Sequence, residues 1–246
     1  MELSVNLRNP AQFFEAVGIA TLLNAQSHFE FEEYDGQPRP RAKFVAEDDI
    51  AKLIADLRAA KFSVVTEADG VKFMVDEYNH PVAVELAGRT TLLDWWLNKF
   101  WSDKSDLKTW AGTSTPLGTL TSLTEMIPSD VADPLNAGVE AGKNSRPNFG
   151  FDPRTASGER GVAAHHAQVT IYPLTELLCA IGLQFVRPVR QEQEFSYHAW
   201  QDALPPELIW LVGAEGLDGV KSKRLVMRKE KRSKGIFAFG AAEFVM

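Results

Sequence analysis

A cluster of positive charge near the C-terminal end is the strongest chemical signal in the sequence. The segment from Lys221 to Lys234 holds eight basic residues and a single acidic residue, Glu230. Lysine and arginine bind phosphate groups, and the planar arginine fork can donate two hydrogen bonds to one phosphate. A solvated strand edge needs only one or two lysines for protection from aggregation, so we expect this segment to contact phosphates. The residues predicted to do so are Arg228, Lys229, Lys231, Arg232 and Lys234, and a smaller basic cluster lies upstream at Arg187 and Arg190.

The stretch 137–161 is a second candidate, because it is rich in glycine, small polar residues and arginine. A loop of this length in a compact domain is commonly functional. Glycines let the backbone approach a ligand, and arginines match phosphate oxygens. The alternative is structural: Phe149 and Phe151 would anchor the loop to the core, and Asp152 would pair with an arginine that follows it. The residues predicted to contact nucleic acid here are Lys143, Arg146, Asn148, Arg154 and Arg160.

Four of the six tryptophans lie between residues 92 and 123. Trp95, Trp96 and Trp101 do not share one helical face and have apolar neighbours, which is typical of buried residues. Trp110 differs, because Lys108 precedes it and a small-residue turn into a capped helix follows. A base-stacking ring, a charge and a helix N-terminus would then lie together. We therefore predict that Lys108 and Trp110 contact a nucleic acid.

No constellation of catalytic residues accompanies these basic elements. The five histidines show no metal-ligand spacing, and the single cysteine, Cys179, cannot build a cysteine-rich zinc site. The phosphate-binding glycine motifs and the nucleophile-elbow motif are also absent from the sequence. We expect no catalytic residues, no metal and no cofactor. A metal-dependent nuclease remains as an alternative, and its candidate ligands are Asp76, Glu77, Glu85 and His165.

The overall composition describes an ordinary globular protein with an uneven charge distribution. The 246 residues are 45% hydrophobic and 24% charged, and the net charge is −7. The basic segment contributes +7, so the remaining residues carry −14, a polarity that can orient the protein on an anionic partner. One cysteine suits a reducing cytoplasm. The sequence shows neither a signal peptide nor an apolar run long enough to span a membrane.

Alternating short strands and capped helices predict how these residues are positioned. Helices are expected after the capping pairs Asn9-Pro10 and Thr115-Pro116 and from Pro173. Gly18 inside the first helix indicates close approach of another backbone. The sequence around Asp69-Gly70 indicates a hairpin, and the two prolines of residues 35–41 indicate a loop.

These elements predict an α+β fold with mixed or antiparallel sheets, several packed helices and a basic C-terminal β-hairpin. We expect a single domain over residues 1–246, with a possible subdivision near 128–147. The first and the third predicted helix share a pattern of proline, alanine, aliphatic residue and glycine. Either a duplication or chance similarity between two buried helices would explain that pattern.

Several motifs resemble a known family. They are VNLRNPAQFFEAVGIATLL near the start, LDWW and KTWAG in the middle, NFGFDPR in the long loop, and YPLTELLCAIGLQFVRP after it. Together they resemble the small proteins encoded beside the backbone and pre-crRNA-processing subunits in type I-U CRISPR loci, called type I-G in some schemes. The resemblance extends over most of the chain, and none of its motifs is a catalytic signature.

The resemblance implies a role as a candidate large subunit of a Cascade-like surveillance complex in antiviral defence. Such a subunit is non-enzymatic and cytoplasmic. It would contact crRNA or target DNA at the protospacer-adjacent duplex, bind other Cascade subunits and help recruit the helicase-nuclease. No membrane partner is implied. The alternative in a different class is a structural adaptor whose basic hairpin binds an acidic protein surface.

Overall fold

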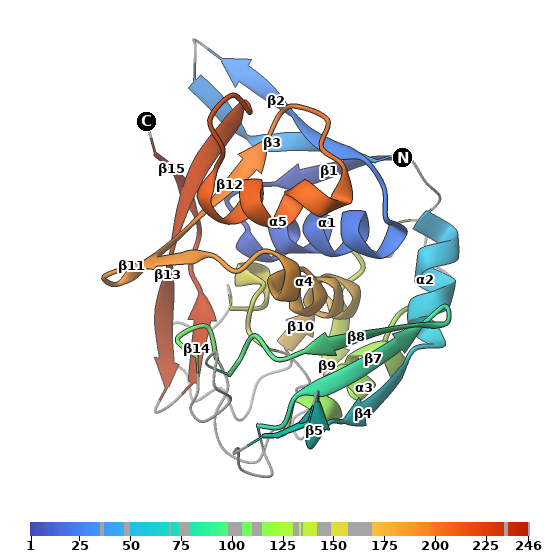
Figure 1. Cartoon of the computed structure of the whole chain (residues 1–246). Helices are drawn as coiled ribbons and strands as arrows, with labels where there is room; N and C mark the ends of the chain where they lie inside the picture. Colours follow the sequence, from blue (N-terminus) through green and yellow to red (C-terminus); the bar gives the residue numbers. More distant parts are fainter. Residues whose placement is uncertain are drawn as a thin grey trace. The chain divides into compact units, whose positions relative to one another are not determined.

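The computed structural model describes residues 1–34, 37–46, 50–68, 70–73, 79–97, 105–109, 115–129, 133, 135–141, 149–156, 169–233 and 236–245. These residues form an α+β fold with five α-helices and several small antiparallel sheets (Figure 1). The predicted fold class is therefore confirmed. Among these described residues, no helix is long and apolar enough to cross a membrane.

The chain divides into two compact units, each assembled from segments that are distant in sequence. The first unit comprises Met1–Leu53, Leu178–Glu230 and Phe239–Met246. The second comprises Ile54–Leu177 and Lys231–Ala238. None of these boundaries falls near 128–147, where the sequence indicated a possible subdivision.

The first unit contains a three-stranded sheet in which β3 (Gln37–Ala46) lies between β1 (Glu2–Asn6) and β2 (Ser27–Tyr34). The expected loop at residues 35–41 is wrong from Gln37 onward, because β3 begins there. The carbonyl group of Pro40 accepts a hydrogen bond from Leu7 N, one residue beyond the last residue of β1, so Pro40 lies where the pairing between β1 and β3 ends. Proline has no N–H to donate, and a strand tolerates it best at such a position at the end of a ladder.

Two helices of the first unit cross at their glycines. Helix α1 (Pro10–Leu23) begins at its predicted cap, where Asn9 Oδ1 accepts a hydrogen bond from Ala11 N at 3.0 Å. Helix α4 (Pro173–Phe185) lies in this unit from Leu178 onward. A Cβ atom at Gly18 would collide with the carbonyl group of Leu178, and one at Gly182 with that of Phe14. The shared glycine pattern therefore has a packing function.

Another sheet, most of which lies in the first unit, includes the basic strand β13. Its strands run in the order β11 (Val189–Gln191), β12 (Glu194–Trp200), β13 (Ser222–Ser233) and β14 (Ile236–Phe239), and β15 (Glu243–Phe244) also pairs with β13. Helix α5 (Pro206–Glu215), which the sequence analysis did not predict, packs on β12 and α1 (Figure 1). Phe13, Tyr197 and Trp200 are fully buried among these elements.

The second unit is organised around short strands and two helices. Helix α2 (Ile50–Arg58) enters it, and β4 (Lys61–Val64), β7 (Val82–Leu86) and β8 (Arg89–Leu93) form a sheet. Strands β5 (Glu67–Ala68) and β6 (Val71–Lys72) form the predicted hairpin. Helix α3 (Pro116–Glu125) is capped by Thr115 as predicted and packs on β4.

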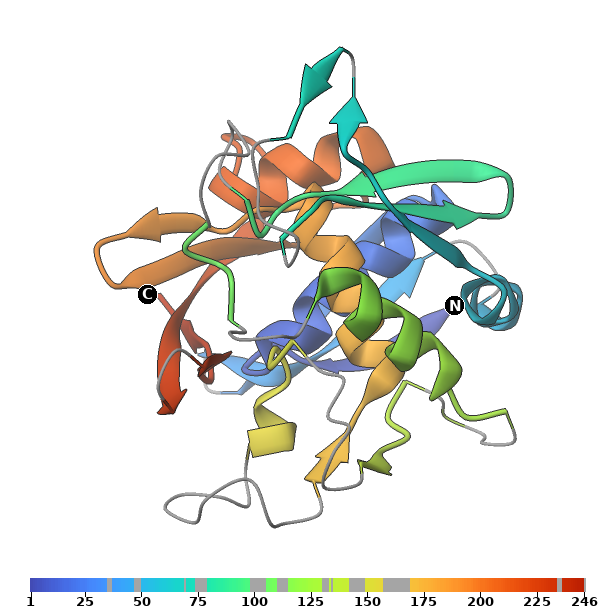
Figure 2. The ribbon, with the colours of Figure 1, turned by 90° about the horizontal axis from the view of Figure 1, so that it is seen from below.

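The long loop of the second unit is framed by another strand pair. Strand β9 (Val139–Ala141) pairs with β10 (Val169–Ile171), which leads into α4. The short 3-10 helix η1 (Pro153–Ala156) lies next to β10 (Figure 2). The described centre of the loop, residues 149–156, thus lies close to the start of α4.

Candidate nucleic-acid interface

The buried tryptophans form an aromatic cluster with the centre of the long loop. Trp95 and Trp96 are fully buried and pack edge to face with ring centroids 5.2 Å apart. Trp95 also contacts Phe151, at 5.3 Å between centroids, and Phe149, at 6.1 Å. The core prediction is confirmed for these two tryptophans, whereas Trp101 and Trp110 lie outside the described residues.

The Glu176 carboxylate holds residues 149–152 on the first turn of α4. Its Oε2 accepts a hydrogen bond from Phe149 N at 3.0 Å. Its Oε1 accepts two more, from Phe151 N at 3.0 Å and Asp152 N at 2.9 Å. A carboxylate that satisfies three backbone N–H groups without water acts as a structural anchor. The sequence analysis missed Glu176, and the only signal for it was an acidic residue in the first turn of a predicted apolar helix.

Burial raises the pKa of Glu176 to about 7 from its ordinary value of 4.5. Desolvation disfavours the charged carboxylate, and the nearby Asp152 charge raises the pKa further. The three backbone N–H groups act in the opposite direction, because they stabilise the ionised form. The balance leaves a carboxyl group that titrates near neutral pH.

Arg154 is engaged by side chains of the same unit. Its Nε lies 3.0 Å from Asp152 Oδ1 and 2.9 Å from Asp152 Oδ2, and the Asp152 side chain is completely buried. The guanidinium group lies 3.6 Å from the ring centroid of Tyr172 and also donates to Asn136 Oδ1 at 2.9 Å. The structural alternative for the loop, with both phenylalanines buried and Asp152 paired, is the arrangement that the structure has for this arginine.

Lys108 is also used within the fold. Its side chain is buried and its Nζ donates a hydrogen bond to Asn79 Oδ1. The neighbouring Thr109 donates its hydroxyl hydrogen bond to the carbonyl group of Phe149. The hydrogen bond from Thr109 therefore helps to hold the anchored loop in place. The other predicted contact residues of the region lie outside the described residues, and their contacts stay predictions: Trp110, Lys143, Arg146, Asn148 and Arg160.

The two faces of strand β13 differ in how deeply their central residues are buried. Leu225 and Met227 are fully buried, whereas Arg228 is exposed and Arg224 is half-buried. Successive residues of a strand point to opposite faces, so Arg224 and Arg228 share the outward face. In the register with β12, Arg228 lies opposite Glu194 and Arg224 opposite His198.

Neighbouring strands supply exposed partners for both arginines. Arg228 Nε donates to Glu194 Oε1 at 2.9 Å, and this hydrogen bond raises the pKa of Arg228. Arg224 donates to Gln191 Oε1. The sequence analysis missed Glu194 and Gln191, because only the register of β11, β12 and β13 brings them beside the arginines.

His198 adds no positive charge to this face near neutral pH. The side chain is half-buried, and its Nδ1 lies 3.3 Å from Ser222 Oγ. Burial lowers the pKa of His198, and the charge of Arg224 lowers it further. Both effects favour the neutral form of the imidazole.

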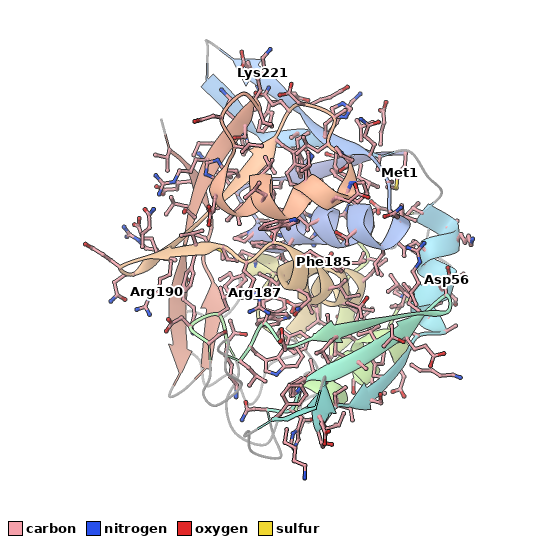
Figure 3. All side chains as sticks on the ribbon, viewed as in Figure 1. Met1, Asp56, Phe185, Arg187, Arg190 and Lys221 are labelled. Carbon is pink, nitrogen blue, oxygen red and sulfur yellow. The ribbon has the colours of Figure 1, made fainter. Side chains whose placement is uncertain are left out.

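The remaining basic residues of the first unit are spread along its surface. Lys221 is exposed, and its backbone N–H donates to Asp202 Oδ2 at 2.7 Å. Arg187 and Arg190 are exposed, and Arg190 Nε donates to the carbonyl group of Glu192 at 2.9 Å. Figure 3 shows Lys221 and Arg190 at well-separated places on the ribbon, so they do not form one patch.

The tip of the basic segment is described only in part, by the backbone of β13 up to Ser233. Lys229 is half-buried on β13, and Lys231 and Arg232 continue the same strand. The side chains of Lys231 and Arg232, and the whole of Lys234, lie outside what the structure describes. Strand β14 is the hydrogen-bonded neighbour of β13. A basic hairpin tip that contacts phosphates therefore stays a prediction from the sequence.

The described residues contain no group of three or more His, Cys, Asp and Glu side chains that could hold a metal ion. Of the ligands considered for a nuclease, Glu85 lies exposed on β7. The others, Asp76, Glu77 and His165, lie outside the described part of the chain.

No protein-family model, no curated protein and no solved structure matches this chain. A functional assignment must therefore be argued from the residues and contacts above.

Proposed function

We propose that the protein is a non-catalytic subunit of a type I CRISPR RNA-guided surveillance complex. In this proposal it contacts the phosphate backbone of crRNA or target DNA through β13 and the turn that follows. The resemblance of the sequence to the small type I-U proteins supports the proposal. The observation that carries it is the two-faced β13, which buries Leu225 and Met227 and turns Arg224 and Arg228 outward.

The chemistry of such a complex suits these features. Guide pairing reads the target sequence, while the protein reads the shape of a short duplex motif and holds backbone phosphates. Phosphate contacts need lysine and arginine on a rigid element, and they need neither a cofactor nor a catalytic centre. The further partners in the proposal are the other Cascade subunits and the helicase-nuclease, and the site of action is the cytoplasm.

The anchored loop has a separate role in this proposal. The contacts of Glu176 and Arg154 fix residues 149–154, which stand between basic stretches in the sequence. Lys143, Arg146 and Asn148 precede the fixed segment, and Arg160 follows it. The anchor would then define the points from which these residues reach a nucleic acid.

The test measures binding of the purified full chain to labelled double-stranded DNA, single-stranded DNA and RNA of equal length. We expect the logarithm of the binding constant to fall linearly as the logarithm of the salt concentration rises, because each phosphate contact releases counterions. Ultraviolet crosslinks should fall in peptides that contain β13. Absence of binding to all three probes at low salt, with subunit association that survives nuclease treatment, would favour the adaptor instead.

A further inference from the structure

Helix α5 presents large apolar side chains to solvent. The side chain of Trp210 is 57% exposed and that of Leu208 is 40% exposed, and Leu217, two residues after the helix ends, is 41% exposed. Only Ile209, Val212 and Gly213 of this helix are buried. The exposed tryptophan thus lies on the outer side of a helix whose inner side packs on β12 and α1.

This exposure is unusual for a helix of such composition. The run Leu208–Val212 consists of five consecutive apolar residues, so no orientation of the helix could bury all of them against one neighbour. A helix that is apolar nearly all round is normally covered on every side. Exposed apolar surface beside polar groups is a common feature of interaction sites, and tryptophan is enriched among the residues that dominate binding energy.

The segment of chain that contains Trp210 is acidic. Residues 201–220 contain four acidic residues and no lysine or arginine. Glu207 is exposed one turn before Trp210 on the helix, Glu215 is exposed at the last residue of the helix, and Asp218 is exposed three residues later. The apolar surface therefore has acidic groups at both ends, the complement of a ligand with an apolar centre and basic flanks.

We infer that Glu207, Leu208, Trp210, Glu215, Leu217 and Asp218 form a docking surface for a basic amphipathic segment of a partner protein. Apolar side chains of that segment would cover the Trp210 ring, and its lysines or arginines would lie beside the acidic groups. A cation near the face of the exposed indole gains further stabilisation. The acidic rim repels nucleic acids and anionic membranes, so a protein is the occupant that fits. The inference does not rest on the proposed contact between β13 and phosphate.

The first experiment uses two fluorescein-labelled helical peptides and the full-length protein. One peptide carries leucine at helical spacing with lysine elsewhere, and the other has glutamate in place of each lysine. Fluorescence anisotropy should show binding of the lysine peptide alone. Trp210→Ala should weaken that binding at least about fivefold. Val245→Ala is the matched control, because Val245 is also exposed in the same unit, at 44%, and should have no effect.

A second experiment tests the charge requirement. The triple variant E207Q/E215Q/D218N should weaken binding of the lysine peptide and flatten its salt dependence. The variant E2Q/E33Q/E243Q neutralises three exposed glutamates elsewhere in the first unit and should do neither. Urea unfolding of each variant confirms that it is folded.

Three results would overturn the inference. The first is equal binding of the lysine and glutamate peptides to the wild-type protein. The second is unchanged binding of the lysine peptide to W210A. The third is concentration-dependent self-association of the wild-type protein in sedimentation velocity that W210A abolishes, because the occupant would then be a second copy of this chain.

Discussion

The loop around residues 149–154 and the strand β13 each carry an arginine paired with an acidic residue, but they use these arginines differently. Arg154 pairs with a carboxylate whose side chain is completely buried, and it stacks on Tyr172. Arg228 pairs with Glu194 at the surface. A surface ion pair is weak and exchanges readily with another anion, whereas breaking a buried pair is costly. The burial of the acidic partner, more than the number of arginines, therefore indicates which basic element can bind a ligand.

The largest effect is expected from removal of the Glu176 carboxylate, which anchors the loop. Glu176→Ala would leave three buried backbone N–H groups without their acceptor, at a cost of about 3 kcal/mol or more in the free energy of unfolding. Urea unfolding followed by fluorescence measures the change. Glu140→Ala is the control, because Glu140 is exposed on β9, and it should change the free energy by less than about 0.5 kcal/mol. Equal stability of the two variants would contradict the anchor.

The raised pKa of Glu176 predicts a pH dependence of stability. Between its ordinary value of 4.5 and about 7 the folded protein binds more protons at this carboxyl group than the unfolded chain does. The contribution of Glu176 to the free energy of unfolding therefore falls as pH rises through this window, by an amount on the order of 3 kcal/mol. The Glu176→Gln variant has no carboxyl group at this position to titrate. As pH rises through this window, the free energy of unfolding of the wild-type protein should therefore fall relative to that of the variant. A constant difference between the two proteins at all pH values would contradict the shift.

Paired lysine substitutions compare the two arginines directly. Arg154→Lys keeps the charge but loses both the fork to Asp152 and the stacking on Tyr172, at a cost of about 1–2 kcal/mol. Arg228→Lys should leave the urea midpoint unchanged, because its partner is at the surface. The unfolding curves of the two variants measure the contrast. Equal shifts would show that burial of the acidic partner does not separate these sites.

The smallest expected effect concerns the surface acid on β12. Glu194→Gln removes the charge that neutralises Arg228, so affinity for DNA or RNA should rise about two- to threefold at low salt. Glu33→Gln, at an exposed position on β2, is the control. A lower affinity in the Glu194 variant would indicate that Glu194 orients Arg228 for binding.

Local signals predicted much of the fold. Asn9 and Thr115 cap their helices as expected, and β5 and β6 pair as the predicted hairpin. Prediction from the sequence failed where contacts with a segment distant in the sequence determine the local structure. Pro38 and Pro40 suggested a loop, and only the end of β1 shows why a strand tolerates them there. Helix α5 was missed.

The candidate site was harder to predict. The sequence around a basic residue does not show whether its acidic partner will be buried or exposed. Arg154 and Arg228 each look like a phosphate ligand in isolation. The partner of Arg154, Asp152, is only two residues away, and the sequence offered that pairing as an alternative. The sequence does not show that Asp152 is buried, because Glu176, which holds its backbone N–H, follows more than twenty residues later. Glu194 precedes Arg228 by more than thirty residues, and only the register of β12 with β13 brings the two together.

The central claim is that the tip of the β13 segment binds a phosphate backbone. Its most direct test compares the charge-reversal variant K231E/R232E/K234E with R41E/K52E/R89E, which makes the same charge change at exposed positions elsewhere. Binding of the full chain to labelled DNA and RNA is measured over a range of salt concentrations. We predict that the first variant binds at least about tenfold more weakly at low salt and that its salt slope flattens by about three. Unchanged affinity with an unchanged salt slope, or an equal loss in the second variant, would contradict the claim.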